Sequence, residues 1–145
     1  MSDLPAVTIY TDGACDPNPG PGGWAALLRY KRTEKILTGS EPQTTNNRME
    51  LTAAVQALQA LDRPCNVIFY TDSEYLKKGI TEWMPTWRKR QWRRKGGALA
   101  NVDLWQQLDV VIQPHQVKWR WVRGHAGDQD NQRVDSLARQ AIRAT

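Results

Sequence analysis

The chain has 145 residues, of which 40% are hydrophobic and 24% are charged. These values are typical of one globular domain with its own core, and they exclude a disordered chain or a solenoid of short repeats. The first residues lack the features of a signal peptide, and no run of 18 apolar residues could span a bilayer. We therefore expect a single cytoplasmic domain over residues 1–145. Cys15 and Cys65 are too few for a disulfide framework, so both thiols are expected to be reduced.

The net charge is +5, with a pI near 9.5, and it is unevenly distributed. The segment 83–102 contains six basic residues and no Asp or Glu, so the remainder of the chain is close to neutral. Localised positive charge of this kind is typical of polyanion binding. We expect a basic protrusion at about residues 81–100.

The hydrophobic pattern predicts three strands, a helix, a central strand, further helices, a fifth strand and a last helix. The predicted strands are residues 6–12, 24–31, 34–38, 66–72 and 117–122. The predicted helices are residues 47–61, two short helices after Ser73 and Thr81, and residues 101–113 and 130–144. This order indicates an α/β fold with a mixed five-stranded sheet. Three antiparallel strands come first, two parallel strands follow, and helices cover both faces.

Four carboxylates stand at the edges of these predicted elements. Asp12 ends the first strand, and Asp72 ends the central strand. Glu50 opens the first long helix, and Asp135 lies one turn into the last. Neighbouring strands that run the same way end at the same edge of a sheet, so we expect the two Asp residues to lie in one cluster. Clustered carboxylates repel one another unless their pKa values rise or cations bind, and oxygen ligands suit Mg²⁺ or Mn²⁺.

Each carboxylate alone also has an ordinary structural explanation. Asp12 and the glycine after it fit a turn, and Asp72 fits a helix N-cap. Glu50 fits a capping box with the asparagine three residues earlier, and Asp135 fits an ion pair with the arginine four residues later. Only the four positions together favour a catalytic cluster.

Four longer motifs contain or flank these residues. They are residues 10–23 (YTDGACDPNPGPGG), 44–51 (TTNNRMEL), 70–75 (YTDSEY) and 122–127 (VRGHAG), the last followed by Asp135. In sequence, order and spacing they resemble ribonuclease H type 1, the bacterial ribonuclease HI family, over nearly the whole chain.

The resemblance implies a ribonuclease H-like fold and an endonuclease that cuts the RNA strand of RNA–DNA hybrids, leaving 5′-phosphate and 3′-hydroxyl ends. It implies that Asp12, Glu50, Asp72 and Asp135 are catalytic and hold two Mg²⁺ ions, with Mn²⁺ as a substitute. It also implies that His125, between two glycines, carries a proton in the reaction, which suits a side chain with a pKa near neutrality.

The resemblance further implies which residues bind the hybrid. Asn18, Asn46, Asn47 and the backbone around Cys15 match positions that read sugars and bases in the minor groove, where the 2′-hydroxyl is displayed. Thr45 and Asn101 match a pocket for a phosphate of the DNA strand. The residues that match the family's basic protrusion are Trp83, Trp87, Arg88, Lys89, Arg90, Trp92 and Arg93. Asn46 and Asn47 could instead cap a helix. Trp83 and Trp87 could instead serve mainly in packing, whereas the cations have no competing role in a core.

Two positions of the substrate-binding set depart from the bacterial pattern. Gln43 stands where an Arg often supports the phosphate pocket, and Glu74 stands where a neutral Gln often reads the minor groove. We expect both differences to weaken hybrid binding. With no separate hybrid-binding domain recognised, the basic protrusion is expected to supply that function in a monomer without membrane contact.

Two other functions remain open from the residues alone. One keeps the fold and assigns DNA as the substrate, as in integrases and resolvases; the asparagine-rich motif and the His125 loop argue against it. The other is a binding module that coats hybrids without cutting them, against which stands the presence of all four carboxylates.

Overall fold

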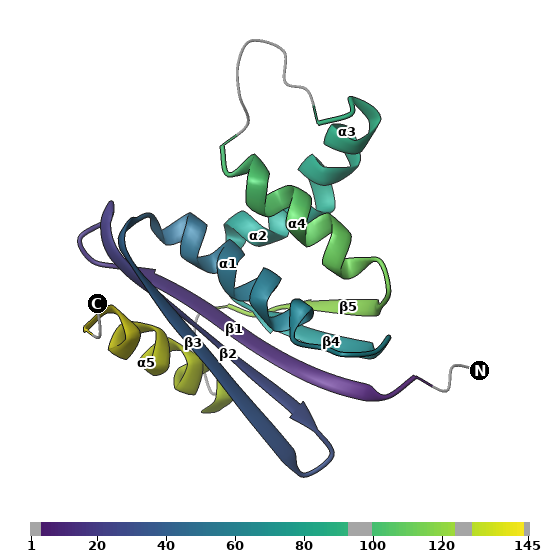
Figure 1. Ribbon diagram of the computed structural model, residues 1–145, viewed down its shortest axis with the longest axis horizontal. Helices are drawn as coiled ribbons and strands as arrows, with labels where there is room; N and C mark the ends of the chain where they lie inside the picture. Colours follow the sequence, from purple (N-terminus) through teal and green to yellow (C-terminus); the bar gives the residue numbers. More distant parts are fainter. Residues whose placement is uncertain (1–3, 93–99, 124–128, 144–145) are drawn as a thin grey trace.

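The computed structural model describes residues 4–92, 100–123 and 129–143. Five strands form one mixed sheet in the order β3-β2-β1-β4-β5 (Figure 1). The strands are β1 (Ala6–Cys15), β2 (Gly20–Tyr30), β3 (Thr33–Thr44), β4 (Asn66–Thr71) and β5 (Gln116–Trp121). Strands β1, β2 and β3 are antiparallel neighbours, whereas β4 pairs in parallel with β1 and with β5. The predicted fold class and sheet are therefore confirmed.

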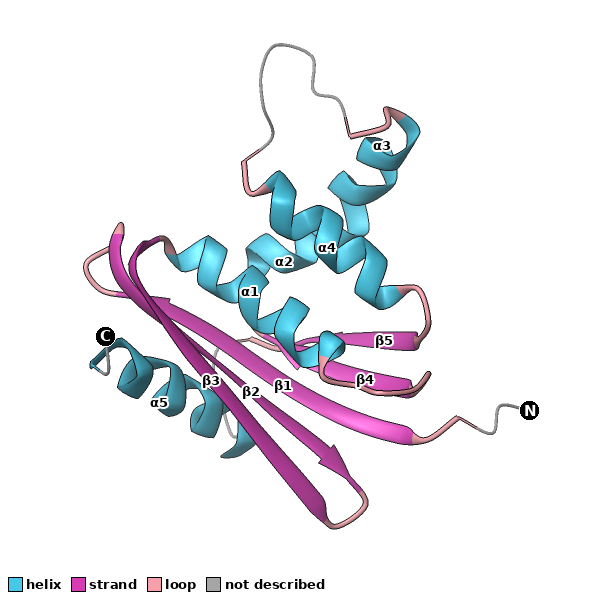
Figure 2. Ribbon diagram, viewed as in Figure 1, coloured by secondary structure: helices cyan, strands magenta, loops and turns pink. Residues whose placement is uncertain are grey.

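Helices cover both faces of the sheet (Figure 2). They are α1 (Asn46–Gln59), α2 (Glu74–Lys78), the π-helical turn η1 (Gly79–Trp83), α3 (Met84–Lys89), α4 (Val102–Ile112) and α5 (Gln129–Arg143). Helices α1 and α4 pack with each other on one face, and α5 packs against β1, β2 and β3 on the other. None of the helices in the described ranges combines the length and hydrophobicity of a bilayer-spanning segment.

Alternating side chains of the strands build two separate cores. Ile9 and Leu28 belong to the larger core, which includes buried side chains of α1 and α4. Tyr10 and Leu27, one residue along each strand, belong to the smaller core with Val134 of α5. Adjacent residues of β1 therefore face different helices, which decides which functional side chain meets which helix.

Several predicted boundaries are wrong for local reasons. Strand β1 does not stop at a turn after Asp12 but continues to Cys15, because Gly13 remains paired with Trp24 of β2. Strand β3 extends to Thr44; its last six residues are mostly polar, so no apolar alternation marked them. Short helices do follow Ser73 and Thr81, as α2 and α3, but η1 joins them into one continuous helical run.

The predicted caps differ as well. Helix α1 is capped by Thr45, whose hydroxyl accepts a hydrogen bond from the backbone of Arg48, and not by Asn47. Helix α2 is capped by Ser73 through the backbone of Leu76, and not by Asp72. The capping explanations for the carboxylates Glu50 and Asp72 are therefore wrong.

Aromatic side chains join the helices above the sheet. Trp105 of α4 is fully buried, and the rings of Tyr75, Trp83 and Trp87 lie around it with centroids 5.3 to 6.3 Å away. Trp92 continues this cluster beside Trp87. The base of the expected protrusion is thus an extension of the main core, and α3 stands away from the sheet (Figure 1).

Candidate active site

The register between β1 and β4 brings Asp12 and Asp72 to the same level of the sheet. Tyr10 of β1 pairs with Tyr70 of β4, and each Asp lies two residues further along its parallel strand. Asp12 is buried within β1, and Asp72 follows the last residue of β4 and is half-buried. The expected proximity of the two Asp residues follows from this parallel pairing.

A glycine allows Glu50 to reach the same place. A Cβ on Gly13 would lie 2.4 Å from the backbone nitrogen of Glu50, so only a residue without a side chain lets α1 approach β1 so closely. Glu50 lies in the second turn of α1 and is 7% exposed. The helix therefore presents a buried carboxylate directly beside Asp12.

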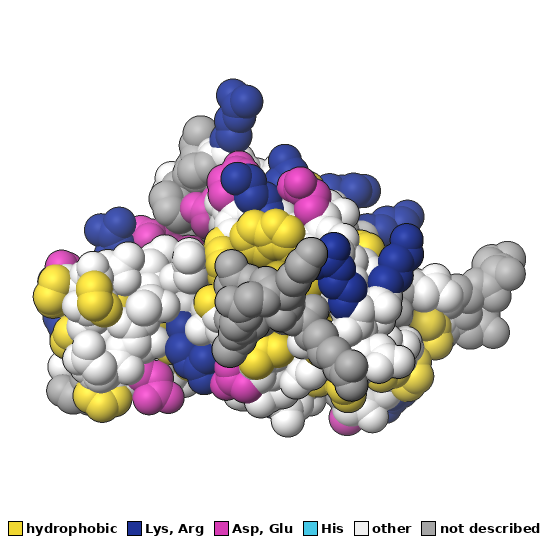
Figure 3. Space-filling model, turned by 90° about the horizontal axis from the view of Figure 1, so that it is seen from above, with side chains coloured by type: hydrophobic (Ala, Val, Ile, Leu, Met, Phe, Trp, Pro, Cys, Tyr) yellow, Lys and Arg dark blue, Asp and Glu magenta, His cyan; other side chains and the backbone are white. Residues whose placement is uncertain are grey.

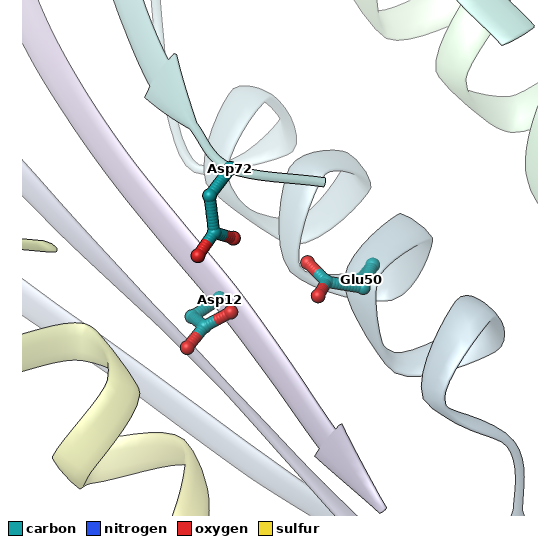
Figure 4. A group of neighbouring side chains, drawn as sticks. All are labelled: Asp12, Glu50 and Asp72. Atoms are coloured by element: carbon teal, nitrogen blue, oxygen red, sulfur yellow. The ribbon is translucent and has the colours of Figure 1, made fainter. Parts of the chain in front are cut away.

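The three carboxylates point toward one another (Figure 4). One ligand oxygen from each of Asp12, Glu50 and Asp72 can be chosen so that all lie within 4.8 Å of one another. They line a cleft of about 630 Å³, together with Cys15 and Asn46 among others. Three hard oxygen donors facing one point match the ligand set of a divalent cation.

Burial makes this cluster electrostatically costly without a cation. It raises the pKa of Asp12 to about 8, and the charge of Asp72 and a hydrogen bond with Asp135 act in the same direction. Burial, followed by the charges of Asp12 and Asp72, also raises the pKa of Glu50 well above its ordinary value. Within the described residues, Oε2 of Glu50 is buried without a hydrogen-bond partner. A bound cation would coordinate that oxygen and also offset the repulsion between the carboxylates. The residues therefore fit a divalent metal.

Asp135 reaches the cleft from the opposite face. A Cβ on Gly23 of β2 would lie 2.3 Å from the backbone oxygen of Ala138, so this glycine lets α5 lie close against the sheet. Asp135 lies one turn before Ala138, lines the cleft and interacts with Asp12. It also forms the ion pair expected with Arg139, at 3.3 Å, so the structural and functional explanations of Asp135 coexist.

A second pocket lies beside the first along the end of α1. It has a volume of about 440 Å³, and its lining includes Asn18, Thr45, Asn47 and Asn101, all four of them expected from the sequence. Asn18 also accepts a hydrogen bond from the backbone of Asn46, at 3.1 Å, which links the two pockets. The predicted sugar-reading and phosphate-binding residues therefore lie in two adjacent depressions.

The residues expected on the protrusion have different surroundings. Trp83, Trp87 and Trp92 are half-buried in the aromatic cluster, which agrees with the packing explanation. Lys89 and Arg90 are exposed. Figure 3, seen from above the helical layer, shows Lys and Arg side chains gathered on this face with some acidic ones among them.

Arg88 is exposed and has no core role, as expected of these cations, but it has an ion-pair partner that the sequence did not indicate. Its Nε donates to Asp109 of α4 at 2.7 Å, and Nη2 pairs with the same carboxylate. Gln43 and Glu74 are exposed and line neither pocket among the described residues. The predictions for Arg93 and His125 lie outside the described residues.

The structure also adds residues that the sequence did not single out. Tyr75 lines the second pocket, and Arg48 donates to Asn101 at 3.2 Å and to Asp103 at 2.7 Å. Arg139 and Arg143 line the acidic cleft. Periodicity carries no signal for such contacts, because Arg48 and its partners are more than 50 positions apart in the chain.

Comparisons with known proteins identify the family of the chain. The family model described as RNase H matches residues 5–143. A ribonuclease H of Bradyrhizobium diazoefficiens is 55% identical over 98% of this chain and 93% of its own length, and one of Halorhodospira halophila is 58% identical over 94% and 92%. The solved structure of LC9-RNase H1, a type 1 RNase H with the type 2 active-site motif, has a TM-score of 0.89 at 36% identity, over 99% of this chain and 75% of that one.

A more distant structure shares the fold. LC11-RNase H1, solved in complex with an RNA/DNA hybrid, has a TM-score of 0.70 at 19% identity, over 95% of this chain and 97% of that one. The family match spans nearly the whole chain, and both of these relatives, at 55% and 58% identity, carry the name ribonuclease H. The chain therefore belongs to the ribonuclease H family and is a ribonuclease H of the bacterial type 1 class.

Proposed function

We propose that the protein is an endonuclease that hydrolyses the RNA strand of RNA–DNA hybrids with divalent metal ions, giving 5′-phosphate and 3′-hydroxyl ends. The observation that carries the proposal is the cluster of Asp12, Glu50 and Asp72, whose ligand oxygens can lie within 4.8 Å of one another. Membership of the ribonuclease H family supports the choice of substrate.

Asp12, Glu50 and Asp72 would hold one Mg²⁺, and Asp12 with Asp135 a second; Mn²⁺ has the same preference for oxygen ligands. Bound there, the metal would activate water and stabilise the leaving 3′ oxygen. The role of the protein is to keep the four carboxylates together in a partly buried cleft. His125 is proposed to carry a proton, on the strength of its motif alone.

Substrate binding is proposed to use both depressions and the exposed cations. Asn46 and the backbone near Cys15 would contact the RNA sugars, because the 2′-hydroxyl is what distinguishes RNA from DNA in the minor groove. Thr45 and Asn101 would bind a backbone phosphate, and Lys89 and Arg90 further phosphates. Contacts of this type carry no base information, so cleavage should have little sequence preference.

One assay tests the proposal. Labelled RNA–DNA hybrid, duplex RNA and duplex DNA are incubated with the protein, with Mg²⁺ or with a chelator, and the ends of the products are analysed. Cleavage of the hybrid's RNA strand alone, only with metal, is expected. Cleavage of duplex DNA would indicate a DNA nuclease with the same fold, and binding of the hybrid without turnover would indicate a non-catalytic module.

A further inference from the structure

The hydroxyl of Tyr75 is held by two hydrogen bonds at the edge of the second pocket. Its oxygen accepts from Nδ2 of Asn101 at 3.0 Å and from Nε1 of Trp105 at 3.1 Å. Trp105 is fully buried, and Asn101 is half-buried just before α4. The position of the phenol oxygen is therefore fixed by one rigid core residue and one residue of the pocket.

The orientation of the Asn101 amide follows from its other partner. Oδ1 of Asn101 accepts from a guanidinium nitrogen of Arg48, at 3.2 Å, and guanidinium nitrogens only donate. The NH₂ group must then face Tyr75, and the phenol oxygen must be the acceptor. The Arg48 guanidinium is itself held by Asp103, with its Nη2 2.7 Å from Oδ2.

These contacts decide where the phenol proton can go. A phenol has one donor proton and room for about two accepted hydrogen bonds, and Tyr75 already accepts two. The proton must point away from both donors, and the pocket lined by Tyr75 and Asn101 is a polar space open to it among the described residues. Among the described lining residues of this pocket none is acidic, whereas the neighbouring cleft contains five carboxylate side chains. The pocket is thus suited to an anion, with Tyr75, Thr45 and the side-chain amides as neutral donors.

We propose that Tyr75 binds a backbone phosphate of the hybrid through its hydroxyl proton while its oxygen holds the Asn101 amide in place. The proposal rests on the proposed function and adds a binding and positioning residue to it. Tyr75 would stabilise substrate and transition state alike, so its loss should raise KM and leave kcat nearly unchanged.

The test measures hybrid affinity of the metal-free protein, which does not depend on turnover. Tyr75→Phe should weaken binding about 10- to 150-fold, the usual effect of losing one hydrogen bond to a charged group. Tyr30→Phe is the matched control, because Tyr30 is an exposed phenol at the end of β2, outside the lining of both pockets; its affinity should equal that of the unmodified protein.

A substitution in the substrate separates a phosphate contact from a folding defect, since Tyr75→Phe also deprives the Trp105 indole of its acceptor. Uncharged methylphosphonate linkages are placed one at a time along each strand. At one position, the neutral linkage should lower the affinity of the unmodified protein. The same linkage should lower the affinity of Tyr75→Phe by a smaller factor, and this loss of affinity is the penalty compared between variants. Asn101→Ala should reduce the penalty at that position too.

The outcomes are distinct. Equal penalties in the unmodified protein and Tyr75→Phe at every linkage would overturn the proposal, as would a variant that loses thermal stability but not affinity. If the unmodified protein neither binds nor cleaves the hybrid, the proposed function itself is wrong. If it cleaves the hybrid normally while Tyr75→Phe has an unchanged KM, only the role of Tyr75 is wrong.

Discussion

A side chain on Gly13 and the backbone of Glu50 cannot occupy their present positions together, because a Cβ there would lie 2.4 Å from the Glu50 nitrogen and 2.5 Å from the carbonyl carbon of Met49. Both contacts are with backbone atoms of a helix, which cannot rotate away as a flexible side chain would. The packing of α1 on β1 is therefore tied to the absence of a side chain at position 13.

Gly13→Ala should push α1 away from β1 and displace Glu50 from Asp12. We expect a loss of about 1–3 kcal/mol of stability from overpacking. Cleavage should fall more than stability accounts for, by on the order of 100-fold, because small displacements of a catalytic group are costly. Urea unfolding and kcat are measured under conditions in which the variant is fully folded. Normal cleavage by a folded Gly13→Ala protein would contradict the role given to this contact.

Asp12→Asn should abolish cleavage and yet stabilise the metal-free protein at pH 8. The pKa of Asp12 is raised to about 8 in the folded state, from an ordinary value of 3.8. The protonated Asp12 side chain stabilises the folded protein. This stability is complete below the pKa of the unfolded state and is lost as the pH rises through the pKa of the folded state. The amide avoids this loss, so the variant should gain about 2 kcal/mol or more over the unmodified protein at pH 8, and much less at pH 4.

Asp130→Asn provides a control of opposite sign for that experiment. In the unmodified protein, Asp130 accepts hydrogen bonds from Arg29 at 3.0 and 3.1 Å, and these lower its pKa. The ionised form of Asp130 therefore stabilises the fold. Stability from Asp130 is present above the unfolded pKa and lost as the pH falls. Asp130→Asn should therefore destabilise the protein at pH 8. Both curves are measured by chemical denaturation in a chelator, and equal signs for the two variants would refute the assignment of a buried, repelled carboxylate to position 12.

Replacing Lys89 and Arg90 by Ala should raise KM and make hybrid affinity less sensitive to salt. If each cation meets one phosphate, the slope of log K against log salt should shrink by roughly 0.7 to 0.9 for each. Arg88→Ala is the comparison, because the Arg88 side chain is paired with Asp109. It should change the slope less. A larger change for Arg88 than for Lys89 or Arg90 would mean that the ion pair opens when substrate binds.

His115 should make stability depend on pH far from the active site. Its Nδ1 accepts a hydrogen bond from the backbone of Cys65 at 3.0 Å, and burial lowers its pKa. The neutral ring is favoured in the fold, so this stability is present above the ordinary pKa of 6.5 and is lost as the pH falls through the lowered folded value. His115→Asn retains an acceptor that does not titrate, and its denaturation midpoint should fall less between pH 7.5 and 5. Identical curves for His115→Asn and the unmodified protein would exclude the effect.

The sequence alone determined the fold class and singled out four carboxylates, which the structure brings to the lining of one cleft. The hydrophobic pattern marked β4 and β5 to within one residue, but it missed the last three residues of β1 and the first four of β2. It marked β3 only in part, because an edge strand with exposed polar residues leaves no such pattern. The carboxylates were identifiable because strand ends and helix starts can be read from local sequence, and because the motifs around them have a family likeness.

Only the tertiary structure decided what each residue touches. Glu50 and Asp72 fitted local capping equally well until packing assigned the caps to Thr45 and Ser73. Arg88 belonged to a basic run in the sequence, but the fold brings Asp109 beside it from 21 positions away. Tyr75 meets Asn101 and Trp105 across 26 and 30 positions. Local sequence carries information on periodicity and turns, whereas such contacts depend on how closely the helices approach the sheet. Gly13 and Gly23 permit that close approach because they have no side chain.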